Sequence, residues 1–68
     1  MKENTLGDNI KAIRLSLGLS QSDFAQKLNV GRTTIGHWET NYSSPSIPML
    51  KNIKKTFNVT YDEIIDGV

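Results

Sequence analysis

Hydrophobic residues near the start of the chain recur every three or four positions, which is the spacing that places side chains on one face of an α-helix. Those of the first segment are Leu6, Ile10, Ile13 and Leu17. Gly18 follows them, and a glycine at this place commonly ends a helix. The pattern therefore predicts a helix over about 5–17.

Two short helices separated by a turn are predicted next. Ser20 begins a sequence that resembles a capping box, in which side chains bind the free amides at a helix start. The helix that follows covers about 21–28, and Asn29 after it tolerates the left-handed backbone of a sharp turn. Gly31 then serves as the N-cap of a helix over about 32–39.

The second half of the chain contains the signals of two more helices. Ser46 caps one of them, and Asn58 closes it. Thr60 and Glu63 form a capping box for a short helix over about 61–66. We therefore expect an all-α fold, a compact arrangement of five short helices joined by tight turns.

The apolar positions of these helices suffice for one small core. We expect that core to contain Leu6, Ile10, Ile13, Leu17, Phe24, Ala25, Leu28, Val30, Ile35, Trp38, Leu50, Ile53, Phe57, Val59 and Ile64. A chain of 68 residues with one core is a single domain, so the domain is predicted to cover 1–68.

Composition excludes several classes of protein. The chain has no cysteine and one histidine, so we expect neither disulfides nor a thiolate or histidine-based metal site. No P-loop, nucleophile triad or carboxylate pair is present, so we expect no enzymatic activity and no cofactor. No apolar run approaches the ~20 residues of a membrane span, and the N-terminus is unlike a signal peptide. A cytoplasmic protein without a membrane partner is predicted.

Charge is distributed unevenly, although the net charge is only +1. Residues 1–55 hold all 8 lysines and arginines, whereas residues 56–68 hold three acidic residues and no basic one. The chain is therefore electrostatically asymmetric, but ordinary surface charge is the better explanation of the charge pattern taken alone.

The segment over about 21–39 has the layout of a helix-turn-helix, with two helices of about eight residues around a three-residue turn. Ala25 is small enough to let the two helices cross closely. Since Ile35 and Trp38 point inward, the opposite face of the second helix must point outward. The residues on that outward face are Arg32, Thr33, Gly36 and His37.

Residues 19–28, which read LSQSDFAQKL, are followed by Val30 and by RTTIGHWE over 32–39. This sequence resembles the lambda-repressor-like helix-turn-helix family of phage repressors, Cro proteins and XRE-type bacterial regulators. The resemblance covers about 5–66 and implies a five-helix domain that binds double-stranded DNA sequence-specifically. It also implies a homodimer on a near-palindromic operator, with half-sites ~34 Å apart and the second helix of the motif in the major groove.

The resemblance further implies a role for individual residues. Base edges would be contacted by Arg32, Thr33 and His37, and DNA phosphates by Gln21, Thr34, Thr40, Asn41, Tyr42 and Ser43. Arg14 and Glu39 occupy the positions of a structural ion pair. The chemistry of Arg32 agrees, because a guanidinium binds guanine O6 and N7 bidentately.

Several alternatives remain open at this point. The role implied is transcriptional repression in a phage, prophage or bacterium, and a protein-interaction module on the same fold is the alternative. The chain is either a whole small regulator or the DNA-binding part of a longer repressor. Near the C-terminus, apolar residues are the candidate dimer contact, namely Ile64, Ile65 and Val68.

Overall fold

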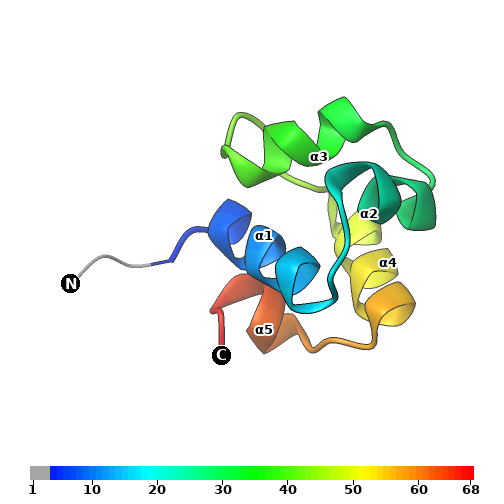
Figure 1. Ribbon diagram of the computed structural model, residues 1–68. Helices are drawn as coiled ribbons and strands as arrows, with labels where there is room; N and C mark the ends of the chain where they lie inside the picture. Colours follow the sequence, from blue (N-terminus) through cyan, green and yellow to red (C-terminus); the bar gives the residue numbers. More distant parts are fainter. Residues whose placement is uncertain (1–3) are drawn as a thin grey trace.

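Five α-helices make up the computed structural model, which describes residues 4–68 (Figure 1). They are α1 (Leu6–Ser16), α2 (Gln21–Leu28), α3 (Arg32–Glu39), α4 (Ile47–Phe57) and α5 (Tyr61–Ile65). No strand occurs within 4–68, so the predicted all-α class is confirmed. The first three residues of the predicted domain, 1–3, lie outside the described residues.

Side chains cap four of the five helix starts. Ser20 and Ser46 each accept a hydrogen bond from the amide three residues later, and Thr60 forms the predicted full capping box. Thr5 forms a second full capping box with Asp8, and this box was not predicted. Gly31 caps α3 without a side chain, so the first amides of that helix are left open.

Asparagines in the left-handed conformation close two helices. Asn29 after α2 has φ 60° and Asn58 after α4 has φ 55°, as the sequence predicts. Gly18 after α1 has φ 69°, in the same left-handed region, which glycine adopts without a steric penalty. These residues let the chain reverse within two or three positions.

The helices pack against one another in a closed ring. Figure 1 shows α1 between α3 and α5, and it packs against both of them. Helix α2 packs on α3 and α4, and α4 in turn packs on α5.

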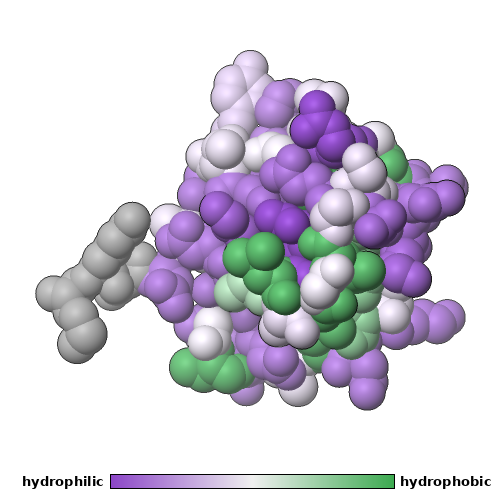
Figure 2. Space-filling view, in the orientation of Figure 1, coloured by the Kyte–Doolittle hydropathy of each residue, from purple (hydrophilic) through white to green (hydrophobic). Residues whose placement is uncertain are grey.

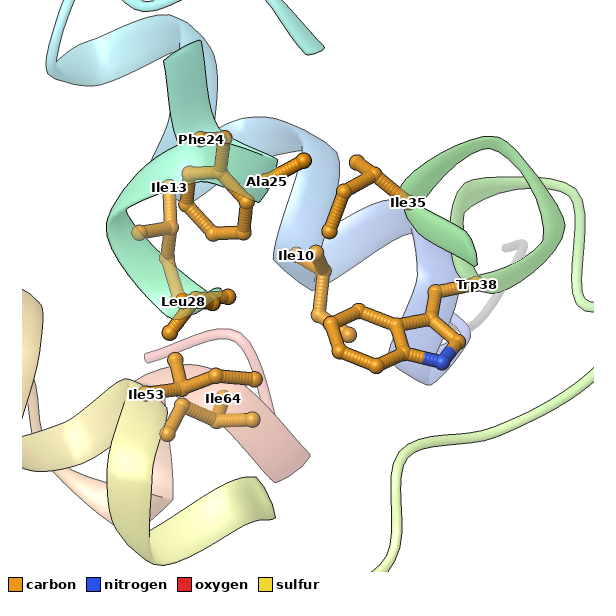
Figure 3. Close-up of a cluster of buried hydrophobic side chains, with 9 residues drawn as sticks. All are labelled: Ile10, Ile13, Phe24, Ala25, Leu28, Ile35, Trp38, Ile53 and Ile64. Atoms are coloured by element: carbon orange, nitrogen blue, oxygen red, sulfur yellow. The ribbon is translucent and has the colours of Figure 1, made fainter. Parts of the chain in front are cut away.

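One hydrophobic core lies where the helices meet (Figure 3). Its buried members are Ile10, Ile13, Phe24, Ala25, Leu28, Ile35, Trp38, Ile53 and Ile64, all of them predicted. The rings of Phe24 and Phe57 stack with their centroids 4.3 Å apart, which joins α2 to α4.

The prediction for Leu17 is wrong, because its side chain is 44% exposed. Helix α1 ends at Ser16, and the turn at Gly18 breaks the helical spacing on which the prediction rested. Leu19 packs against the core in this region instead, and so does Met49 on α4, neither of which was predicted.

A buried asparagine fastens the short C-terminal helix. Asn9 on α1 is 3% exposed, and its Nδ2 donates to the carbonyls of Ile64 and Ile65 at 3.0 and 3.1 Å. These are carbonyls at the end of α5, which have no partner within the helix. A five-residue helix is unstable alone, so this bond and the burial of Ile64 hold it in place.

Candidate nucleic-acid interface

Helices α2 and α3 form the helix-turn-helix predicted over about 21–39. Ala25 is buried where they cross, and its carbonyl accepts the amide of Val30 at 3.0 Å. Because Asn29 adopts the left-handed conformation, the turn is completed in three residues. The angle between the two helices is thus set by local geometry and by core packing.

One side of α3 faces solvent. Arg32, Thr33 and His37 are exposed, whereas Ile35 and Trp38 are buried on the opposite side. We call the exposed residues Arg32, Thr33 and His37 the reading face. The surface over α3 is mostly hydrophilic in Figure 2, where this helix is at the top.

The start of α3 favours anions. No acidic residue lies in its first turn, and Gly31 supplies no side chain to its amides. The positive end of the helix dipole therefore meets solvent next to Arg32.

A buried ion pair links α1 to the end of α3. Arg14 Nε donates to Glu39 Oε2 at 2.6 Å and Nη2 to Oε1 at 3.1 Å, with side chains only 10% and 4% exposed. Arg14 Nη1 also donates to the carbonyl of Leu19 at 2.9 Å. The structure thus pairs the two residues for which the sequence predicted an ion pair, and the guanidinium is bonded on all three nitrogens.

This ion pair extends to the reading face through Gln21. The Nε2 of Gln21 donates to Glu39 Oε1 at 3.1 Å, so its Oε1 is turned away from that carboxylate. Arg32 Nη1 donates to this Oε1 at 3.3 Å. Glu39 thereby fixes the orientation of the Gln21 amide, and the amide in turn holds Arg32. The role predicted for Gln21 is a phosphate contact, and its bonds to Glu39 and Arg32 were not predicted.

Residues 40–43, which we call the exit turn, fold back on the end of α3. Four amides of the turn donate to carbonyls of α3, those of Thr40 to Gly36, Asn41 to Trp38, and both Tyr42 and Ser43 to His37. The Thr40 hydroxyl also donates to the Gly36 carbonyl at 3.0 Å. The hydroxyls of Tyr42 and Ser43 are therefore the donors that this turn offers to a phosphate, since the backbone amides and the Thr40 hydroxyl already donate within the domain.

Asn41 ties the exit turn to the start of α1. It has φ 62°; its Oδ1 accepts the amide of Gly7 at 3.0 Å and its Nδ2 donates to Thr5 Oγ1 at 2.9 Å. Gly7 permits this approach, because a Cβ there would lie 2.3 Å from the carbonyl oxygen of Trp38. The second hydrogen of Nδ2 is the group that this side chain has left for a phosphate, since Oδ1 is an acceptor. Two features of the sequence could have indicated these bonds: Gly7 in the first turn of a helix, and Asn41 shortly after the end of another, as Asn29 and Asn58 follow theirs.

The aromatic ring of Tyr42 lies against the imidazole of His37. Their centroids are 4.6 Å apart and the planes are tilted by 45°. Tyr42 is nevertheless 79% exposed. The pair therefore sits on the surface at the C-terminal end of the reading face.

The candidate dimer contact needs a correction. Ile64 is fully buried in the core, so it is not available to a partner. Ile65 and Val68 are 52% and 82% exposed, and hydrophobic surface is visible at the C-terminus in Figure 2. The spacing of the apolar residues in this short helix did not show that Ile64 faces the core and Ile65 faces solvent.

Among the described residues, no group of three or more histidines, cysteines and acids is placed to hold a metal ion. No helix within the described part of the chain has the length and hydropathy needed to cross a membrane.

Comparison with known proteins gives consistent matches. A model of the helix-turn-helix family matches residues 10–64. The HTH-type transcriptional activator BcrR of Enterococcus faecalis is 37% identical over 60 residues, which are 88% of this chain and 29% of that protein. The HTH-type transcriptional regulator ImmR of Bacillus subtilis (strain 168) is 30% identical over 61 residues, 90% of this chain and 48% of that protein. The chain thus spans less than half the length of these relatives.

Solved structures match over most of the chain. The P22 c2 repressor in complex with a synthetic operator has a TM-score of 0.85 at 23% identity, over 96% of this chain and 98% of that one. The restriction-modification controller protein C.Esp1396I has a TM-score of 0.74 at 33% identity, over 87% of this chain and 81% of that one. The first of these likenesses is one of fold, because its sequence identity is low.

Proposed function

Because the chain belongs to the helix-turn-helix family, we propose that it binds double-stranded DNA sequence-specifically as the DNA-binding domain of a transcription regulator. It acts by binding and not by catalysis. The observation that carries the proposal is the reading face of α3, which is polar, carries Arg32, and is held from behind by the buried Arg14–Glu39 pair.

In this proposal α3 lies in the major groove and α2 crosses the backbone. Arg32 binds guanine O6 and N7, Thr33 meets a thymine methyl or a base acceptor, and His37 reaches a third base edge. Each good bidentate pair contributes ~1–3 kcal/mol of discrimination against the wrong base. Since Gln21 already holds Arg32 in the free protein, part of the entropy of ordering that side chain is removed before DNA arrives.

Phosphate contacts surround the reading face. We place them at the start of α2, at Thr34, and at the hydroxyls of the exit turn. The residues are Gln21, Thr34, Tyr42 and Ser43, joined by Thr40 when its hydroxyl turns from the Gly36 carbonyl to the phosphate. Asn41 contributes by holding the exit turn against α1, through the bonds to Gly7 and Thr5. These contacts are independent of sequence and set the salt dependence of binding.

The proposal includes a homodimer on a near-palindromic operator, because one domain of this size makes few base contacts. Its two half-sites would lie ~34 Å apart, which is one turn of DNA. The exposed Ile65 and Val68 are the proposed contact. Repression is the proposed outcome, because a dimer bound to an operator that overlaps a promoter keeps the polymerase from it.

The test is selection of binding sites from a randomised duplex pool at near-physiological salt, followed by sequencing. We expect an enriched near-palindrome. Arg32→Ala should relax the preference at one base pair of each half-site. Arg32→Lys is the matched control, because it keeps the charge and the salt slope but not the bidentate fork.

Three outcomes contradict parts of the proposal. An unpaired half-site would remove the dimer. An unchanged preference with Arg32→Ala would remove the groove assignment. No enrichment, with binding that vanishes as salt rises, would leave only phosphate attraction, and the protein-interaction module would then be the better explanation.

A further inference from the structure

The contact between Tyr42 and His37 is not a consequence of burial. Both residues are exposed, Tyr42 by 79%, yet their ring centroids are 4.6 Å apart. A tyrosine ring that is free in solvent has no reason to stay beside one particular neighbour. The backbone must therefore bring the two side chains close enough for the ring contact to form.

Two amides of the exit turn supply the first part of that constraint. Those of Tyr42 and Ser43 both donate to the carbonyl of His37, at 2.9 and 3.2 Å. The backbone of Tyr42 is thus bonded directly to the backbone of the residue that its ring covers. This fixes the distance between the two side chains at their roots.

Asn41 supplies the second part from outside the turn. Its left-handed conformation reverses the chain immediately before Tyr42, and its amide group is bonded to Gly7 and Thr5 on α1. A different helix therefore anchors the exit turn, which cannot swing away from α3 without breaking these bonds.

The imidazole of His37 is consequently restricted on a face of α3 that is otherwise open. A histidine on an exposed helix samples several rotamers, and each one presents its nitrogens in a different direction. The Tyr42 ring occupies one side of the imidazole and removes the rotamers that point there.

We propose that Tyr42 is a positioning residue, whose ring holds the His37 imidazole in the orientation in which it reads a base. This inference rests on the proposed function, because it assigns the base contact to His37. The ring acts through His37, whereas the hydroxyl of Tyr42 is the group available to a phosphate. The two roles are separable by substitution.

The experiment measures relative affinities for the selected operator and for its single-base-pair variants. The proteins are the wild type, Tyr42→Phe, Tyr42→Ala, His37→Ala and the double variant. Tyr42→Phe should keep the base preference. Tyr42→Ala should reduce discrimination about two- to tenfold, the range expected when one side chain loses its fixed orientation. The loss should fall at the base pair where His37→Ala also acts.

The double variant shows whether the ring acts through the imidazole. If it does, adding Tyr42→Ala to His37→Ala causes no further loss at that base pair. A second readout needs no DNA, namely the NMR shifts of the His37 ring protons, which should move in Tyr42→Ala and stay close to wild type in Tyr42→Phe.

The inference is overturned by any of four results. These are an unchanged preference in Tyr42→Ala, a loss at a different base pair, additive losses in the double variant, and unchanged His37 shifts in Tyr42→Ala. They leave the proposed function intact as long as the wild type still selects an operator. If the wild type selects none, both fall together.

Discussion

The substitution Glu39→Gln removes one charge from the pair that joins α1 to α3 and leaves Arg14 buried without it. The Arg14 and Glu39 side chains are 10% and 4% exposed, so water cannot replace the lost partner. Removing one member of a buried ion pair typically costs ~3–5 kcal/mol. A domain of 68 residues has a free energy of unfolding of roughly 3–10 kcal/mol at ~0.05–0.15 kcal/mol per residue. The variant should therefore lose most of its stability.

Geometry adds to the effect of charge. Both carboxylate oxygens of Glu39 accept hydrogen bonds, from Arg14 and, at Oε1, also from Gln21. An amide in this place turns one acceptor into a donor that faces another donor. If Gln21 rotates its own amide to adapt, its nitrogen then faces Arg32, and the bond at 3.3 Å is lost.

Urea unfolding at 25 °C, followed by the fluorescence of Trp38 and by far-UV circular dichroism, measures the change. With a slope of ~1 kcal/mol per molar urea, the midpoint should fall by ~3 M or more. If the variant is unfolded in buffer, titration with trimethylamine N-oxide recovers its folded baseline. Asp23→Asn is the control, because it removes an exposed acid and should change stability by less than ~1 kcal/mol.

Two results would refute the reasoning. One is a loss below ~1 kcal/mol for Glu39→Gln, which is typical of an exposed ion pair. The other concerns Arg14→Met combined with Glu39→Leu. This double variant fills the site with apolar atoms and leaves no buried charge, so it should be more stable than Glu39→Gln. A double variant that is less stable would contradict the account.

Three further predictions concern other parts of the molecule. Gly7→Ala should destabilise the domain, since the new Cβ would lie 2.3 Å from the Trp38 carbonyl oxygen. Gly36→Ala has open space and should stabilise α3 by ~0.5–1 kcal/mol, and thermal unfolding measures both changes. Asn9→Asp loses the donor to the Ile64 carbonyl and should cost ~1–3 kcal/mol, with the loss of α5 amide protection in hydrogen exchange as the specific sign. Added salt should weaken DNA binding but strengthen dimerisation, because each α5 carries acidic residues beside the proposed contact; sedimentation and DNA titrations over one salt series test this pair of opposite slopes.

Local signals were enough to predict the helices. Each helix combines an apolar stripe with a capping residue, and the two depend only on neighbours in sequence. The predicted ends at Asn29 and Asn58 are confirmed by their left-handed backbone. Leu17 shows the limit, because a period of 3.6 residues holds only while the helix continues, and α1 had already ended.

The interactions behind the site were not predictable in the same way. The bonds of Gln21 to Glu39, of Asn41 to Gly7 and of Asn9 to Ile64 join residues 18, 34 and 55 positions apart. No periodicity connects such positions, and a polar residue on a short helix has the same local pattern whether it is buried or exposed. The exposed side of α3 was predictable because Ile35 and Trp38 identify the buried side.

Gln21 is bonded to the buried ion pair, whereas the residues of the reading face are exposed, and this difference matters for evolution and for engineering. Arg32, Thr33 and His37 are exposed and contribute little to the core, so they can be exchanged at small thermodynamic risk. Gln21 sits between Glu39 and Arg32, so a change there alters fold and recognition together. A library that aims to redirect this domain to new operators should vary the three residues of the reading face and keep Gln21 and Glu39 constant. Variants at Gln21 or Glu39 would be less stable, so fewer of them would remain folded for selection on DNA.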